Sequence, residues 1–146
     1  AQTQVCKAER IKNPNVRCTF NFSIVGPGPV PIIDAALEFA YKEGIIGIAA
    51  AGNIPISLDL IPFYPAAKQG TIVVSALDPS EQLTFFSGYS PKMLNVAALG
   101  VGIWIPVPKT GANAKEDGYR VGEGTSFAAP QVTGIKDKVL RCKFSV

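Results

Sequence analysis

The sequence feature with the clearest chemical potential is a serine surrounded by small residues, in the stretch GEGTSFAAPQVTG at residues 122–134. Glycine and alanine around Ser126 would let another backbone approach its hydroxyl closely. If a helix begins here, the Ser126 N–H lies in the first turn, unpaired and at the positive end of the helix dipole. That N–H could bind an oxyanion while the hydroxyl attacks a carbonyl. The alternative is a plain N-cap, which is the commoner role for a serine.

A second candidate is Asn53, which ends the stretch AAAGN after an apolar run. At the end of a parallel strand, its side-chain amide could donate hydrogen bonds to a developing negative charge. The alternative is a turn residue with left-handed backbone, a common role for asparagine. The sequence contains no histidine, so the chain itself lacks the usual base for a serine nucleophile.

Composition and charge favour a folded, loop-rich protein. The 146 residues are 47% hydrophobic and 17% charged, and the glycines and prolines are scattered without a repeat. A net charge of +3 without a basic run argues against nucleic acid or an anionic membrane as partner. The longest apolar run, residues 45–52, is too short for a transmembrane segment. The N-terminus lacks the apolar core of a signal peptide, so we expect any targeting segment to be absent or already removed.

The three cysteines, Cys6, Cys18 and Cys142, do not have the spacing of a metal site. Three free thiols are one interpretation. In an oxidising compartment Cys6 could instead pair with Cys18, leaving Cys142 free or bonded to another chain. The sequence leaves both alternatives open.

The elements that would position Ser126 and Asn53 alternate between strands and helices. In the first half we expect a polar segment at 1–16 with a turn at 13–15, a buried strand at 18–25 ended by GPGPVP, a helix at 31–44 and a strand at 44–53. A proline-containing loop at 54–70 leads to a strand at 71–78 and to a short extended piece and turn at 83–90. A fourth strand followed by an irregular apolar segment lies within 93–108, then a surface hairpin or loop at 110–121 and a helix from Gly124 to about Cys142.

This order predicts an α/β fold with an open parallel sheet and helices on both faces. Strands joined through helices by short connections pair in parallel. Strands that are apolar throughout belong to a sheet covered on both sides. Ligands of such sheets bind beyond the carboxyl ends of the strands, where the turn at Asn53 and the loop before Ser126 would lie.

Taken together and in this order, the motifs resemble the subtilisin-like serine protease family. The matching segments are GTSFAAPQVTG (124–134) for the nucleophile block, IIGIAAAGN (45–53) for the strand that ends in the oxyanion asparagine, FNFSIVG (20–26) for the strand that pairs with substrate backbone, and YPAAKQGTIVVSALD (64–78) and FFSGYSPKMLNVAALGVGI (85–103) between them. The resemblance covers about residues 18–136. It predicts the C-terminal half of a subtilisin-like catalytic domain over 18–146, preceded by a polar segment at 1–17.

The resemblance implies roles for individual residues. Ser126 would be the nucleophile, and the Asn53 side chain with the Ser126 N–H would form the oxyanion hole. The residues implied to bind substrate are Ser23, Ile24 and Val25 along the cleft, Ala50, Ala51 and Gly52 as a pocket wall, and Thr125 beside the nucleophile. Calcium is implied by the resemblance alone, and because the family's calcium sites often involve loops not present here, no metal ligand is assigned.

The sequence also departs from the family pattern. The segments that carry the catalytic aspartate and histidine normally precede this region and are missing. Gln131 stands where the nucleophile block usually has a non-catalytic histidine. Val25 stands where a glycine usually opens the specificity pocket, which argues against a deep pocket for bulky residues.

Two functions therefore remain open. The chain could be the nucleophile-bearing part of a serine endopeptidase that hydrolyses peptide bonds through an acyl-enzyme, with Asp and His supplied by another chain or by the other half of a cleaved precursor. It could instead be an inactive, protease-derived structural or peptide-binding subunit. Both predict an obligate protein partner covering the exposed edge of the first strand. The first suggests an extracellular, secretory or vacuolar location and the second an organellar one.

Overall fold

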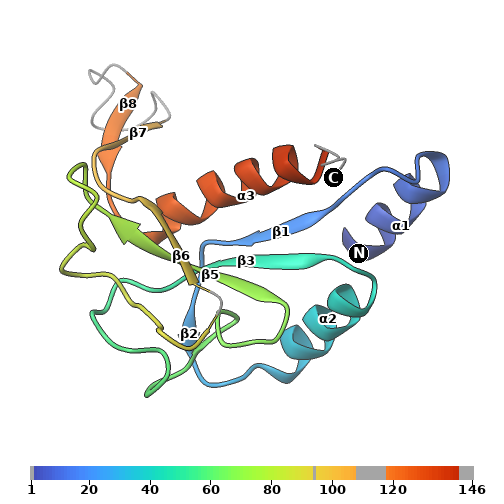
Figure 1. Cartoon of the computed structure of the whole chain (residues 1–146), viewed down its shortest axis with the longest axis horizontal. Coiled ribbons are helices and arrows are strands. Elements are labelled where there is room, and N and C mark those ends of the chain that lie inside the picture. The colour runs from blue at the N-terminus through green and yellow to red at the C-terminus, as the bar shows by residue number, and fades with distance from the viewer. Residues whose placement is uncertain (1, 94, 108–117, 142–146) are drawn as a thin grey trace, which may run out of the picture.

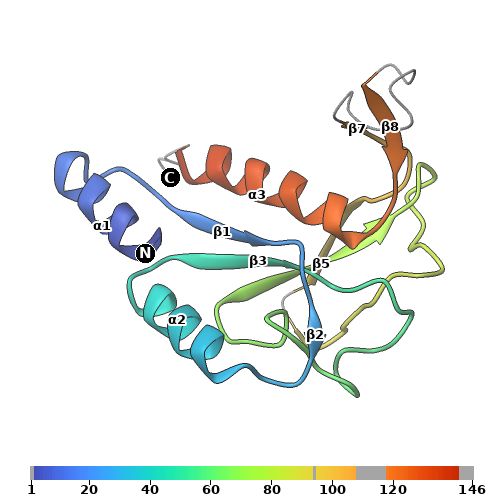
Figure 2. The same cartoon turned by 180° about the vertical axis from the view of Figure 1, so that it is seen from behind.

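A four-stranded parallel sheet carries the fold of this computed structural model, which describes residues 2–93, 95–107 and 118–141. The strands pair in the order β1 (Thr19–Phe22), β3 (Ile46–Ala50), β5 (Thr71–Leu77) and β6 (Asn95–Leu99). Helix α3 (Thr125–Arg141) packs along one face and α2 (Pro31–Lys42) lies on the opposite side, as Figures 1 and 2 show. The predicted α/β fold with helices on both faces is confirmed.

The core has two layers because the side chains of β3 alternate between the faces of the sheet. On the α3 face, Ile48 and Ala50 pack with Ala128 of the helix. On the other face, Ala49 packs with Phe63 and other residues of the loop that follows β3. The small alanines of β3 and α3 allow close approach, so the start of α3 is brought against the carboxyl ends of the strands.

Helix α2 follows its sequence signals closely. Pro31 occupies the first turn, where its missing N–H costs no hydrogen bond. Gly44 follows the helix with φ of +70°, the left-handed conformation that glycine adopts without strain. The predicted helices at 31–44 and from Gly124 are both confirmed, the second beginning one residue later than predicted.

Two small antiparallel pairs were not predicted. Strand β2 (Gly26–Pro27) pairs with β4 (Phe63–Tyr64), within the segments predicted as a strand stop and a loop. Strand β7 (Ile103–Pro106) pairs with β8 (Tyr119–Gly122), so the prediction of an irregular apolar segment before residue 108 was wrong. Both pairs depend on long-range partners that local patterns do not reveal. Residues 110–117 of the predicted hairpin or loop lie outside the described residues.

The first strand also differs from its prediction. Strand β1 covers only Thr19–Phe22 and is half-buried where a buried strand was expected. It lies at the edge of the parallel sheet, where β3 is its one partner among the described strands. The described part of the chain therefore buries the apolar side chains of β1 only partly.

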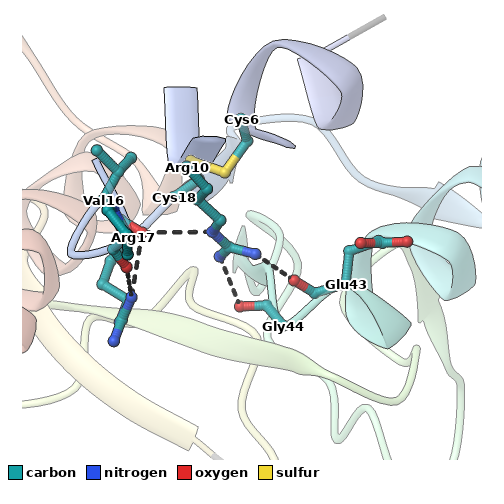
Figure 3. The surroundings of a disulfide bond; sticks show 8 residues. Cys6, Arg10, Val16, Arg17, Cys18, Glu43 and Gly44 are labelled. Atoms are coloured by element: carbon teal, nitrogen blue, oxygen red, sulfur yellow. Dashed lines mark hydrogen bonds between the residues drawn. A yellow bond between two sulfur atoms is a disulfide. The ribbon is translucent and has the colours of Figure 1, made fainter. Parts of the chain in front are cut away.

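The polar segment at the N-terminus forms a helix, α1 (Gln2–Lys12), which the sequence did not predict because its mean hydropathy is low. A disulfide joins Cys6 on this helix to Cys18 just before β1, so the interpretation as three free thiols is wrong for this pair. Figure 3 shows the Arg10 side chain beside the disulfide, donating hydrogen bonds to the carbonyls of Glu43 and Gly44 after α2. Cys142 lies outside the described residues.

No helix within the described ranges is long and apolar enough to cross a membrane.

Candidate active site

Ser126 is the second residue of α3, and the neighbouring elements fix its position. Its Oγ donates a 2.9 Å hydrogen bond to the Ser23 carbonyl just beyond β1, and the Ser23 hydroxyl donates a 3.0 Å bond to the Ser126 carbonyl. A plain N-cap would instead accept from an N–H of its own helix. Within the described residues the Ser126 N–H has no backbone acceptor, as expected in a first turn.

Asn53 reaches the same helix start from the end of β3. Its Oδ1 accepts two 2.9 Å hydrogen bonds from Thr125, one from the backbone N–H and one from the hydroxyl. Because a backbone N–H can only donate, these bonds assign Oδ1 as the acceptor. Nδ2 has no hydrogen-bond acceptor among the described residues. Asn53 is exposed and has no positive φ, so the alternative of a left-handed turn residue does not describe it.

Glycine at position 124 makes this approach possible. Gly124 has φ of +137°, and a Cβ built there would lie 2.9 Å from Asn53 Nδ2. An alanine would therefore be strained and would push against the amide. The sequence predicted close approach of neighbouring backbone at this glycine, and the Gly124 N–H does donate a 2.8 Å hydrogen bond to the Gly100 carbonyl. The close approach of the Asn53 side chain was not predicted.

Thr125 connects the two candidate residues. It was assigned to substrate binding, but its side chain is buried and bonded within the protein. Its Oγ1 donates to Asn53 and accepts a 3.1 Å bond from the Gly52 N–H. Thr125 therefore orients the Asn53 amide, a role that only the three-dimensional contacts reveal.

The other residues assigned to substrate binding divide into exposed and buried positions. Ile24 is 69% exposed, whereas Ala50 and Ala51 lie in the core and can offer a substrate only backbone atoms. Val25 is half-buried, and a Cβ at Gly52 would meet its Cγ2 at 3.2 Å. Side chains therefore already fill the space beside Gly52.

The site can bind negative charge with neutral donors, and it holds a hydroxyl beside them. The nearest acceptor of the Ser126 proton is a backbone carbonyl, which is far too weak a base to activate a serine. The described residues contain no group of three or more His, Cys, Asp or Glu side chains that could hold a metal ion. They do not fit a carboxylate-rich calcium site, and no chemistry here is assigned to calcium.

Comparison with known proteins assigns this chain to a family. The sequence model of the subtilase family matches residues 19–142, and the chain belongs to this family. It represents part of a subtilisin-like serine protease domain.

Individual relatives agree with this assignment. The chain is 35% identical over 114 residues to subtilisin-like proteinase Mp1 of Magnaporthiopsis poae, covering 76% of this chain and 26% of that protein. It is 32% identical over 121 residues to subtilisin DY of Bacillus licheniformis, covering 82% of this chain and 41% of that protein. The solved structure of S41 psychrophilic protease superposes with a TM-score of 0.74 at 25% identity, covering 94% of this chain and 47% of that one. The chain thus spans less than half the length of these relatives.

Proposed function

We propose that this chain is the nucleophile-bearing part of a subtilisin-like serine endopeptidase. Ser126 attacks the scissile carbonyl of a peptide, and the carbonyl oxygen becomes an oxyanion that accepts hydrogen bonds from Asn53 Nδ2 and the Ser126 N–H. A histidine from outside this chain takes the serine proton and later delivers it to the leaving amine, while an aspartate, also from outside this chain, orients the imidazole and stabilises its charged form. They come either from another segment of the same precursor or from a partner chain.

One observation carries the proposal: Thr125 donates two hydrogen bonds to Oδ1 of Asn53, one from its backbone N–H and one from its hydroxyl. The amide is thereby oriented before any substrate arrives, its Nδ2 protons meet no acceptor in the described part of the chain, and the Ser126 N–H is close by in sequence. Preoriented donors stabilise a transition state because they need no reorganisation during the reaction.

A second candidate function is an inactive, protease-derived subunit that binds peptides or stabilises an assembly. It is favoured by the reciprocal pair of Ser23 and Ser126, in which the hydroxyl proton is directed to a carbonyl. The absence of histidine from the sequence favours it as well. In both functions we propose that a protein partner or another segment covers the edge of β1, which would otherwise be open to aggregation.

Labelling with a fluorophosphonate probe separates the two functions. The native protein, meaning this chain with any segment or chain that accompanies it, is compared with the isolated chain and with a Ser126→Ala variant. We expect Ser126 to be modified in the native protein at least about 10³-fold faster than in the isolated chain, because the residual rate without a triad rests on the oxyanion hole and binding alone.

A matched control is Ser90→Ala, which removes a serine that is 4% exposed and whose hydroxyl bonds to Asp59 and the Met93 N–H. This variant should label like the wild type. Absence of Ser126 labelling in the native protein would reject the endopeptidase and leave the inactive subunit as the function.

A further inference from the structure

A buried pair of serines holds the loop after residue 84 against the turn that carries Asn53. The Ser75 hydroxyl on β5 donates a 2.8 Å hydrogen bond to the Gly88 carbonyl, and the Ser87 hydroxyl donates a 2.9 Å bond to the same oxygen. Ser75 is 2% exposed and Ser87 is 1% exposed. The Gly88 N–H in turn donates a 2.9 Å bond to the Gly52 carbonyl.

The loop is also fixed to the sheet, so these bonds link two rigid parts of the protein. Ser87 Oγ accepts a 2.9 Å bond from the Ala76 N–H on β5. A Cβ built at Gly88 would lie 2.4 Å from the Ala51 carbonyl oxygen, so only glycine permits this approach. The residues that connect β5 to Gly52 through these contacts are therefore buried and closely packed.

These contacts matter because Gly52 is the residue whose backbone freedom would otherwise displace Asn53. Gly52 has φ of +95°, a region in which glycine meets little steric restraint. Its N–H is held by Thr125 Oγ1 and its carbonyl by the Gly88 N–H. The peptide groups on both sides of Gly52 are thus anchored, one to α3 and the other to the loop at Gly88.

We propose that Ser75, Ser87 and Gly88 are positioning residues that set the place of the Asn53 amide through Gly52. Thr125 fixes the direction of the amide, and the three positioning residues fix the backbone from which it projects. The consequence for catalysis rests on the proposed endopeptidase function, whereas the structural coupling between Gly88 and Asn53 does not.

The test compares Ser75→Ala with the control Ser90→Ala in the native protein. Both variants remove a buried hydroxyl, but Ser90 bonds to Asp59 and the Met93 N–H and has no bond to Gly88 or Gly52. Two signals report the coupling without any need for activity. They are the side-chain amide resonances of Asn53, assigned by their loss in Asn53→Asp, and the hydrogen-exchange rate of the Gly88 N–H.

We expect Ser75→Ala to shift the Asn53 side-chain resonances and to speed Gly88 exchange about 5- to 10-fold, the factor that corresponds to one lost buried hydrogen bond. If the native protein is labelled at Ser126, the labelling rate and kcat should fall by a similar factor of about 5 to 10 while KM stays within about twofold, because an oxyanion donor acts on the transition state. Ser90→Ala should change none of these.

The outcomes separate this inference from the proposed function. If the wild-type native protein is not labelled, the endopeptidase fails, and the Asn53 and Gly88 signals still decide the coupling. If Ser75→Ala leaves both signals as they are in Ser90→Ala, the coupling is refuted, whatever the labelling result. Should Ser75→Ala fail to fold, Ser87→Ala removes the other donor to Gly88 and is judged by the same criteria.

Discussion

Replacing Gly124 by alanine tests the geometry of the site most directly. The new Cβ would lie 2.9 Å from Asn53 Nδ2, and the residue would keep a φ of +137° that side chains rarely adopt. Backbone strain of this kind costs about 1–3 kcal/mol. Loss of an oxyanion-hole donor costs about 10²–10³ in kcat, a magnitude measured in subtilisin, a member of the same family. We therefore expect Gly124→Ala to lose both stability and most of its Ser126 labelling.

The matched control is Gly134→Ala in the same helix, where a Cβ would meet nothing within 4 Å. In a helix interior this change should stabilise the protein by about 0.5–1 kcal/mol. The assay measures fluorophosphonate labelling and urea unfolding of the native protein for both variants, together with the Asn53 side-chain resonances. If Gly124→Ala labels like the wild type and its Asn53 resonances do not move, then close contact at Gly124 does not hold the amide in place.

Three further predictions concern the disulfide, the cleft and the N-terminal helix. Replacing Cys6 and Cys18 by serine should lower the free energy of unfolding by about 3 kcal/mol, because the bridge closes a loop with a sequence separation of 12. Val25→Gly should open space beside Gly52 and raise kcat/KM for peptides with a bulky residue before the scissile bond, compared with peptides that have alanine at that position. The same change should lower the free energy of unfolding by about 1–3 kcal/mol. Arg10→Ala should cost about 1–3 kcal/mol, because its guanidinium bonds to carbonyls at the end of α2.

Each of these predictions has its own check. Reducing agent should lower the unfolding midpoint of the wild type to that of the double serine variant and leave the variant unchanged. An unaltered substrate preference in Val25→Gly would show that Val25 does not limit the cleft. Arg17→Ala is the control for Arg10, since its side chain is exposed and its bonds within the described residues go to the nearby Pro14 and Val16 carbonyls. Equal stability of the two arginine variants would contradict the assigned role of Arg10.

Much of the arrangement could be predicted from sequence because it follows from local chemistry. Continuous apolar strands separated by a capped helix define a parallel sheet covered on both sides. The carboxyl ends of adjacent parallel strands meet at one edge, so Asn53 after β3 had to lie near elements that end or begin at that edge. Gly124, Ser126 and the alanines after them indicated a crowded helix start. These signals required no knowledge of distant contacts.

Other features escaped prediction because their causes are far apart in the sequence. Helix α1 is polar and has little pattern of its own, and it is held by Cys18 and by the contacts of Arg10 with the end of α2. The pairing of β2 with β4 involves two residues on each side, too few to leave a periodic signal. Nothing in the local sequence of Ser75 distinguishes it from other strand residues, since its partner is the carbonyl of Gly88.

The sequence by itself determined the fold class and the family, and it supplied the two residues proposed as the centre of the candidate site. Strand and helix periodicity, the glycines and the order of the motifs all act over short distances and can be recognised without coordinates. Only the tertiary structure decided which atom of the Asn53 amide accepts the bonds of Thr125, which carbonyl accepts the Ser126 proton and which residues hold Gly52. These depend on hydrogen bonds between residues more than thirty positions apart, and a one-dimensional pattern contains no record of such partners.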